Sequence, residues 1–121
     1  MAQEDYVLIN KQDQWIELTL NRPQNLNSLS EKMMQALQRA LHDIAEQDDI
    51  TCVILKAKGK AFSAGGDLEW VGSMVQDYQG MKAAFKEAGD LVYGMMRCEK
   101  IIISAINGVA VGAGLAVALM A

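Results

Sequence analysis

Cysteine, histidine and proline are scarce in this sequence, which limits the chemistry it can carry. The two cysteines, Cys52 and Cys98, show no CxxC spacing and belong to no Cys/His cluster, so we expect ordinary reduced thiols and no metal site. The only histidine, His42, falls beside polar positions of a predicted helix, where a solvated surface residue is expected. The only proline, Pro23, marks a loop, because the residue before a proline is biased away from helix.

Positive charge is also in short supply. Eleven Lys and Arg against fifteen Asp and Glu give a net charge of −4, which argues against nucleic-acid binding. A ligand that carries phosphate would therefore have to be held by local groups. Residues 1–10 are acidic and poor in apolar side chains, unlike a signal peptide or a transit sequence, so the expected location is the cytoplasm.

Several common catalytic and nucleotide-binding motifs are missing. The chain has no GxxxxGK[ST], and no GxGxxG follows its first predicted strand, so a nucleotide site is not indicated. Ser63 stands between Phe62 and Ala64 and not between the glycines of a GxSxG elbow, which gives a serine hydrolase no support.

The patterns that are present predict one α/β domain. Hydrophobic residues make up 51% and charged residues 21% of the 121 residues, as in globular proteins. The order of strand, helix and strand predicts a βαβ unit with a right-handed crossover. Strands are predicted at 6–10 and 15–20, which form a hairpin, and at 52–55 and 101–106, which are buried on both faces. Helices are predicted at 31–47, with Ser28 or Ser30 as the N-cap, at 67–74 and at 81–97, and residues 109–121 are a glycine-rich entry to an apolar helix. The third helix is expected to collect its apolar residues on one side: Met81, Ala84, Phe85, Ala88, Leu91, Val92, Met95 and Met96.

Residues 101–121 form a run of 21 uncharged residues that allows two interpretations. The length suits a membrane span, and Gly108 and Gly112 have GxxxG spacing. The turn dipeptide Asn107-Gly108 and the glycines divide the run, however, which favours a buried strand, turn and helix. The chain stops at Ala121 inside this apolar helix, without the Lys, Gly or Pro that usually end one, so we expect a fragment of a longer domain or a fold completed by something else.

Two glycine-rich segments follow predicted strands. The first is AFSAGGDL at residues 61–68, with Gly65 and Gly66, and the second is Gly112-Ala113-Gly114. Because the carboxyl ends of parallel strands meet at one edge of a sheet, two backbone N–H groups there could point at a single oxygen, as in an oxyanion hole. The same glycines could instead serve only tight turns and close helix packing. Spacing alone leaves both interpretations open.

Three motifs in order carry a resemblance to a known family. LNRPQNLNSL at residues 20–29, AFSAGGDL at 61–68 and INGVAVGAGLAVAL at 106–119 resemble the N-terminal signatures of the crotonase superfamily, the enoyl-CoA hydratase/isomerase family. The resemblance implies an α/β fold, a crotonase-like spiral of ββα units, truncated here after the second oxyanion-hole helix start. Residues 1–121 would be the N-terminal part of a single acyl-CoA-binding domain whose C-terminal part is absent. It also implies a homo-oligomer, either a trimer or a dimer of trimers.

The resemblance assigns roles to residues of this chain. Gly66 and Ala113 would donate the two backbone N–H groups that hold a thioester carbonyl and stabilise its enolate. Coenzyme A would enter as part of the acyl-CoA substrate, with no separate cofactor, metal, nucleic acid or membrane involved. The residues implied to line the coenzyme A site are Asn25, Leu26, Ala64, Gly65, Gly66, Asp67 and Leu68.

The proton-moving groups of the family are not visible in this chain. Hydratases of the family carry a glutamate three residues after the second oxyanion-hole residue, where this chain has Ala116, and a second glutamate in a segment beyond Ala121. The nearest acids in sequence, Asp67, Glu69 and Glu99, are expected at a helix start or in solvent. The resemblance thus implies an acyl-CoA enzyme of fatty acid metabolism, a lyase or isomerase, whose residues 1–121 are inactive alone. The alternative is a catalytically incomplete acyl-CoA-binding or scaffold protein.

Overall fold

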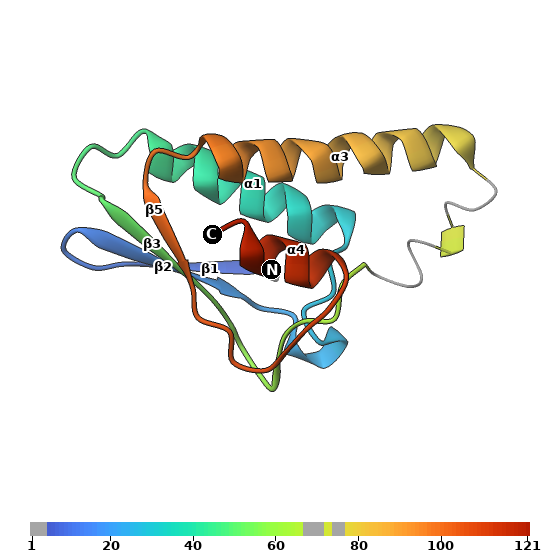
Figure 1. Cartoon of the computed structure of the whole chain (residues 1–121), viewed down its shortest axis with the longest axis horizontal. Coiled ribbons are helices and arrows are strands. Elements are labelled where there is room, and N and C mark those ends of the chain that lie inside the picture. Colours follow the sequence, from blue (N-terminus) through green and yellow to red (C-terminus); the bar gives the residue numbers. More distant parts are fainter. Residues whose placement is uncertain (1–4, 67–71, 74–76) are drawn as a thin grey trace.

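The structure is a computed structural model that describes residues 5–66, 72–73 and 77–121. Each pair of strands along the chain is followed by an α-helix, and a short 3-10 helix, η1, lies between the first hairpin and the first α-helix (Figure 1). The elements are β1 (Val7–Lys11), β2 (Trp15–Leu20), η1 (Pro23–Asn25), α1 (Glu31–Ala45), β3 (Cys52–Ala57), β4 (Ala61–Ser63), α3 (Tyr78–Arg97), β5 (Ile101–Ser104), β6 (Val109–Ala110) and α4 (Ala113–Leu119).

The strands form two sheets. Four of them make a sheet in the order β1-β2-β3-β5, in which β1 and β2 are antiparallel and the other pairs are parallel. The antiparallel pair β1–β2 confirms the predicted hairpin, and the parallel pair β2–β3, joined through α1, confirms the predicted βαβ unit. The remaining strands, β4 and β6, pair in parallel as a small second sheet. The α/β class predicted from the sequence is therefore confirmed.

Helix α1 begins where the capping signal places it. Ser30 is the N-cap, and its hydroxyl oxygen accepts a hydrogen bond from the Met33 N–H at 3.2 Å. The helix ends at Ala45, two residues before the predicted end. Its apolar residues recur at three- and four-residue spacing and are buried: Met33, Met34, Leu37, Ala40, Leu41 and Ile44.

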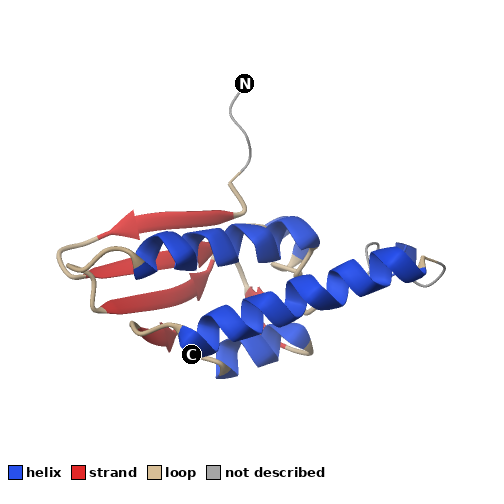
Figure 2. Ribbon diagram, turned by 90° about the horizontal axis from the view of Figure 1, so that it is seen from above, coloured by secondary structure: helices blue, strands red, loops and turns tan. Residues whose placement is uncertain are grey.

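The main core lies between the four-stranded sheet and its helices. Alternate residues of β2 and β3 are buried, as expected for strands with one covered face. Figures 1 and 2 show α1 and α3 side by side above this sheet, and the two helices contact each other. Each fully buried aliphatic side chain contributes about 1.5–3 kcal/mol relative to an exposed one. The sheet residues in this core are Ile16, Leu18, Leu20, Val53, Leu55 and Ala57.

The prediction that two strands are buried on both faces is wrong. In β3, Cys52 and Ile54 are only half-buried, while their neighbours Val53 and Leu55 are fully buried. In β5, which ends at Ser104 and not at residue 106, Ile101 is 66% and Ile103 is 50% exposed. The physical reason is that the helices cover one face of the sheet, whereas Cys52, Ile54, Ile101 and Ile103 share the opposite face, on which no described helix packs.

Helix α3 is longer than predicted and less uniformly buried. It begins at Tyr78, three residues early, because the Asp77 carboxylate accepts a hydrogen bond from the Gly80 N–H at 3.1 Å and caps the helix. Phe85 and Met96 are 70% and 68% exposed, so the apolar residues do not form one buried side. Its buried residues are Ala84, Leu91 and Met95. The helix predicted at 67–74 lies mostly outside the described residues.

The segment after residue 106 differs most from its prediction. The glycine-rich entry expected at the start of residues 109–121 contains the short strand β6 and a turn at Gly112, and the helix expected after it is α4. Leu115 and Leu119 of α4 are 43% and 71% exposed, so this helix is not a buried one. Ala61–Ser63, expected to be loop, pairs with β6 as β4. None of the helices formed by described residues is long and apolar enough to cross a membrane.

Candidate functional site

The three sequence motifs lie against one another, joined by main-chain hydrogen bonds. The Leu29 N–H donates to the Gly65 oxygen at 2.6 Å, and the Ala64 N–H donates to the Leu26 oxygen at 3.0 Å. The third motif joins through the Val111 N–H, which donates to the Ser63 oxygen at 3.2 Å. Segments that are far apart in the chain are thus brought into one site around β4 and β6.

Asn27 ties the first motif to the second from inside. Its side chain is fully buried, and its φ of 52° is a left-handed conformation that asparagine tolerates better than most residues. The side-chain oxygen accepts from the Arg22 N–H at 2.7 Å. The side-chain NH₂ donates to the oxygens of Lys58 and Ala61 at 2.9 and 3.0 Å. All three hydrogen bonds join the Asn27 side chain to main-chain groups. Asn27 therefore holds the backbone of the first motif against the backbone on either side of the 58–61 turn.

Ser63 continues this network. Its buried hydroxyl donates to the Asn27 main-chain oxygen at 2.8 Å and accepts from the Gly65 N–H at 3.3 Å. A hydroxyl engaged in this way orders the Gly65 backbone, which agrees with the expectation that Ser63 is not a nucleophile. Sequence reasoning did not single out Asn27 or Ser63 for this role, because neither has a local pattern that marks a long-range hydrogen bond.

Two glycines allow the close approach of the second and third motifs. Gly65 has a φ of +96°, and a Cβ placed there would lie 3.0 Å from the Val111 oxygen and 3.7 Å from the Ala113 nitrogen. A Cβ at Gly114 would lie 2.6 Å from both the Cβ and the main-chain oxygen of Ser63. Larger residues at either position would push the two segments apart. The packing role that spacing alone suggested for these glycines is therefore real.

The two predicted donor residues lie at the exposed rim of this site. Gly66 forms an isolated parallel bridge with Leu29, and Ala113 is the first residue of α4. Both residues are exposed. Between the residues that the structure describes, no backbone hydrogen bond uses the N–H of Gly66 or of Ala113.

The residues predicted to border coenzyme A are brought together in part. Asn25 is the last residue of η1, and Leu26, its C-cap, is 40% exposed with a left-handed φ of 53°. The Leu26–Ala64 hydrogen bond places them beside the second motif. Ala64 is half-buried and Gly65 is buried. Asp67 and Leu68, the other two predicted residues, lie outside the described part of the chain.

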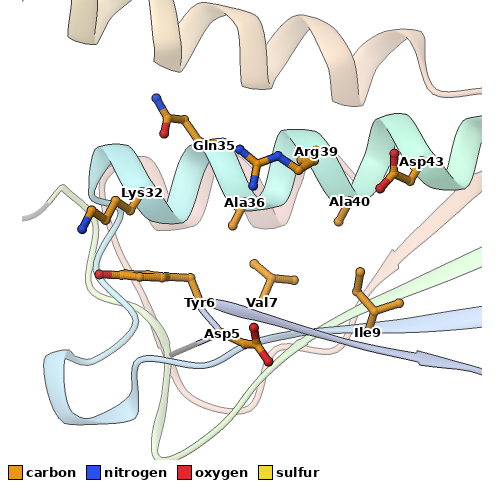
Figure 3. A pocket seen from close by; sticks show the side chains of 10 residues that line it. All are labelled: Asp5, Tyr6, Val7, Ile9, Lys32, Gln35, Ala36, Arg39, Ala40 and Asp43. Atoms are coloured by element: carbon orange, nitrogen blue, oxygen red, sulfur yellow. The ribbon is translucent and has the colours of Figure 1, made fainter. Parts of the chain in front are cut away.

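Two grooves of about 510 Å³ each lie elsewhere on the molecule. Figure 3 shows the first, in which Tyr6, Val7 and Ile9 face the α1 residues Ala36 and Ala40, with Lys32 and Arg39 on the same helix. The second lies between α1 and α3 and includes His42 and Arg97. Neither groove is lined by a residue of the three motifs.

The other candidate side chains are surface groups. His42 is exposed and lies 3.6 Å from the Glu46 carboxylate, which confirms its solvated position. Glu99 is exposed, and both Cys52 and Cys98 are free thiols of intermediate burial. Across residues 5–66, 72–73 and 77–121, no group of three or more His, Cys, Asp or Glu side chains is arranged to hold a metal ion.

Comparison with known proteins places this geometry in a family. The family model described as Enoyl-CoA hydratase/isomerase matches residues 16–121. Probable enoyl-CoA hydratase EchA14 of Mycobacterium tuberculosis is 34% identical over all of this chain and 46% of its own length. Probable 3-hydroxyisobutyryl-CoA hydrolase 3 of Arabidopsis thaliana is 36% identical over 98% of this chain and 32% of its own length.

Solved structures agree with the sequence matches. An enoyl-CoA hydratase from Mycobacterium smegmatis superposes with a TM-score of 0.88 at 33% identity, over 97% of this chain and 46% of that chain. An enoyl-CoA hydratase/isomerase (crotonase) from Legionella pneumophila gives a TM-score of 0.89 at 28% identity, over 98% and 46%.

These matches define an α/β chain with the crotonase fold. The protein belongs to the enoyl-CoA hydratase/isomerase family, as an N-terminal segment of the crotonase fold. It spans half or less of the length of these relatives.

Proposed function

We propose that this chain binds an acyl-CoA thioester and, as part of a complete domain, processes it as an enoyl-CoA hydratase/isomerase-type enzyme. The thioester oxygen would receive hydrogen bonds from the N–H groups of Gly66 and Ala113. The observation that carries the proposal is the closeness of the two loops: a Cβ at Gly65 would lie 3.7 Å from the Ala113 nitrogen. Family membership supports the thioester as the ligand class.

The proposed chemistry is stabilisation of an enolate. When a proton leaves the carbon next to a thioester carbonyl, negative charge moves to the carbonyl oxygen. Two fixed N–H donors favour that charge without acting as acids, and losing one such donor costs about 3 kcal/mol of transition-state stabilisation. Asn27 and Ser63 would keep the Gly65-Gly66 backbone in position, since their hydrogen bonds hold that loop.

The coenzyme A moiety would lie along the surface formed by the first two motifs. Asn25, Leu26 and Ala64 are neighbours there, linked by the Leu26–Ala64 hydrogen bond. Asp67 and Leu68 belong to the same predicted border. A homo-oligomer, a cytoplasmic location, and a substrate that needs no separate cofactor remain predictions from the resemblance.

The residue at position 116 favours a second function, in which the chain binds acyl-CoA without catalysis. Ala116 is exposed on α4, one helical turn after Ala113, so its side chain lies on the same helix face as the proposed donor. A methyl group there cannot move a proton. The chain would then be a catalytically incomplete acyl-CoA-binding or scaffold protein that keeps the two donors.

The experiment is an NMR titration of ¹⁵N-labelled protein with crotonyl-CoA, with coenzyme A as the control ligand. We expect the amide signals of Gly66 and Ala113 to shift with crotonyl-CoA and much less with coenzyme A. Ala113→Pro removes one donor at the first position of a helix, where proline is tolerated. Its matched control, Ala113→Ser, keeps the N–H.

The variants give the proposal a quantitative test. A hydrogen bond contributes about 0.5–1.5 kcal/mol net, so Ala113→Pro should weaken binding roughly threefold to tenfold, and Ala113→Ser should not. Absence of binding at high micromolar crotonyl-CoA would refute acyl-CoA binding by this chain. Binding that leaves the Gly66 and Ala113 signals unmoved would refute the proposed donors.

A further inference from the structure

The first strand of the larger sheet has an outer edge. Among the described strands, β2 is the only neighbour of β1. The register of this pair continues to Tyr6, whose oxygen accepts a hydrogen bond from the Asn21 N–H at 2.8 Å. Hydrogen-bonded and non-bonded pairs alternate along antiparallel strands. The N–H and C=O groups of Val7, Ile9 and Lys11 therefore point away from β2, where they can pair with another strand.

A groove of about 510 Å³ runs beside this edge, between β1 and α1. Val7 and Ile9 are level with buried residues of β2, so their side chains share the sheet face that α1 covers. Figure 3 shows them facing the methyl groups of Ala36 and Ala40. Ile9 is nevertheless 55% exposed, because these small side chains do not cover it. Alternate side chains of an added strand could fill this space.

Charged side chains are arranged in order along the groove. Figure 3 shows Lys32 near the start of β1 and Asp43 level with Ile9, while the Arg39 side chain extends back toward the Lys32 end. Asp5 also borders the groove, but its carboxylate lies on the side of β1 away from α1. No ion pair between described residues includes Lys32, Arg39 or Asp43. The groove thus has positive charge at one end and a carboxylate at the other.

We propose that this groove binds an extended peptide as an added antiparallel strand, in which a basic, an apolar and an acidic residue alternate with polar ones. Antiparallel pairing continues the pattern of β1 and β2 and places the acidic residue beside Lys32 and the basic residue beside Asp43. Main-chain hydrogen bonds would give affinity and the alternate side chains specificity. No residue of the three motifs lines the groove, so this inference does not depend on acyl-CoA binding.

The length of the groove sets the length of the peptide. From Lys32 to Asp43 the helix rises about 16 Å, at roughly 1.5 Å per residue. About five strand residues span that distance, at roughly 3.4 Å each. The first, third and fifth side chains face α1, which gives one basic, one apolar and one acidic position.

A second copy of this chain fits the edge less well. Two β1 edges can join in antiparallel fashion about a twofold axis perpendicular to the sheet, and such an axis keeps both α1 helices on the same side. Because α1 packs over β1, the second α1 would enter the space beside the first. Neighbouring strands are about 4.8 Å apart, whereas packed helix axes are about 8–10 Å apart. A single extended peptide avoids this crowding.

The binding experiment measures fluorescence anisotropy of the fluorescein-labelled, C-terminally amidated peptide Gly-Arg-Thr-Val-Thr-Glu. The control peptide Gly-Thr-Arg-Val-Glu-Thr has the same composition but turns both charges to the other face of the strand. We expect the first peptide to bind about fivefold tighter than the control, the effect of two exposed ion pairs. Lys32→Glu should reduce this preference to less than about twofold, whereas Lys82→Glu, on an exposed lysine of α3, should keep it.

A second pair of variants tests the groove itself. Ala36→Phe would fill the space beside Ile9 and should abolish binding. Ala83→Phe makes the same change at an exposed position of α3 outside the groove and should leave binding intact. Circular dichroism checks that each variant is folded.

Amide hydrogen exchange of the original protein tests for strand addition without any substitution. The Leu8 N–H faces β2 and should exchange slowly with or without peptide, whereas the Ile9 N–H should exchange quickly in the free protein. Bound peptide should slow exchange at Ile9 by about tenfold or more. Binding that leaves Ile9 unprotected would overturn the proposal.

Three further results would also overturn it. One is the absence of binding at millimolar concentrations of the first peptide, and another is equal affinity for the control peptide. The third is a dimer, detected by light scattering, in which the Ile9 N–H is protected without peptide, because a second copy would then occupy the edge.

Discussion

The hydroxyl of Ser63 lies 2.8 Å from the main-chain oxygen of Asn27 and donates a hydrogen bond to it. Both residues are fully buried, and the same hydroxyl accepts from the Gly65 N–H. One side chain therefore connects the loop of the first motif to the backbone that precedes Gly66. Because these bonds lie behind the exposed surface, the position of the proposed donor is set from the interior of the protein.

The first prediction concerns the donors of Asn27. Asn27→Asp keeps the shape of the side chain but replaces its NH₂ with an oxygen that faces the oxygens of Lys58 and Ala61. Leaving these buried groups unpaired should lower the free energy of unfolding by about 2–4 kcal/mol in urea denaturation. Asn25→Asp makes the same change on an exposed residue and should shift stability by less than about 0.5 kcal/mol. Equal effects of the two substitutions would show that the Asn27 network contributes little.

The second prediction compares two glycines in helices. Gly114→Ala would place a methyl group 2.6 Å from the Ser63 Cβ and should destabilise the protein by about 1–3 kcal/mol through overpacking. Gly94→Ala in α3 meets no atom within 4 Å, so alanine there should stabilise by about 0.5–1 kcal/mol. In thermal unfolding, the melting temperature should fall in Gly114→Ala and rise in Gly94→Ala. A stabilising Gly114→Ala would mean that α4 does not pack against β4 this closely.

The local elements could be predicted from the sequence because their signals are local. The Ser30 cap, the spacing of apolar residues in α1 and the alternation in β2 each follow from neighbouring residues. The pairing of β4 with β6 could not be predicted, since strands of three and two residues carry no periodicity of their own. Their structure depends on contacts between segments distant in the chain.

Burial was predicted least well where the chain is most apolar. A run such as Ile101–Ser104 indicates a buried strand, yet burial on both faces also requires a layer on each face, and the described helices cover only one face of this sheet. Part of the candidate site could likewise be predicted from the sequence and part could not. The two glycine-rich segments could be found from their residues and motifs, but the buried Asn27–Ser63 contact behind them depends on three-dimensional packing.

The third prediction concerns an ion pair at the end of the first hairpin. The Lys11 ammonium lies 3.0 Å from the Asp49 carboxylate, and its hydrogen bond holds the pKa of Asp49 below its ordinary value. A lowered pKa in the folded state means that the pair stabilises the protein above the unfolded-state pKa. This contribution is lost as pH falls through the folded-state pKa.

The measurement is an NMR titration of the Asp49 carboxyl carbon. Lys11→Met should raise the pKa of Asp49 toward its ordinary value, and added salt should do so partly in the original protein, because both side chains are exposed. Lys86→Met serves as the control, since Lys86 pairs with Asp90 on α3. An Asp49 pKa that does not change in Lys11→Met would contradict the assignment.

The last prediction separates binding from turnover. If the Gly66 and Ala113 donors operate without a nearby acid or base, residues 1–121 should bind crotonyl-CoA but show no hydration above the rate in buffer. Enolate stabilisation alone leaves no group to move the proton, and Ala116 offers only a methyl group beside Ala113. The measurement is the ultraviolet absorbance of crotonyl-CoA, and the contradicting result is a loss of absorbance with purified protein that disappears in Ala113→Pro. Such turnover would show that a residue of this chain supplies the acid or base, and it would favour the enzyme over the binding protein for this chain alone.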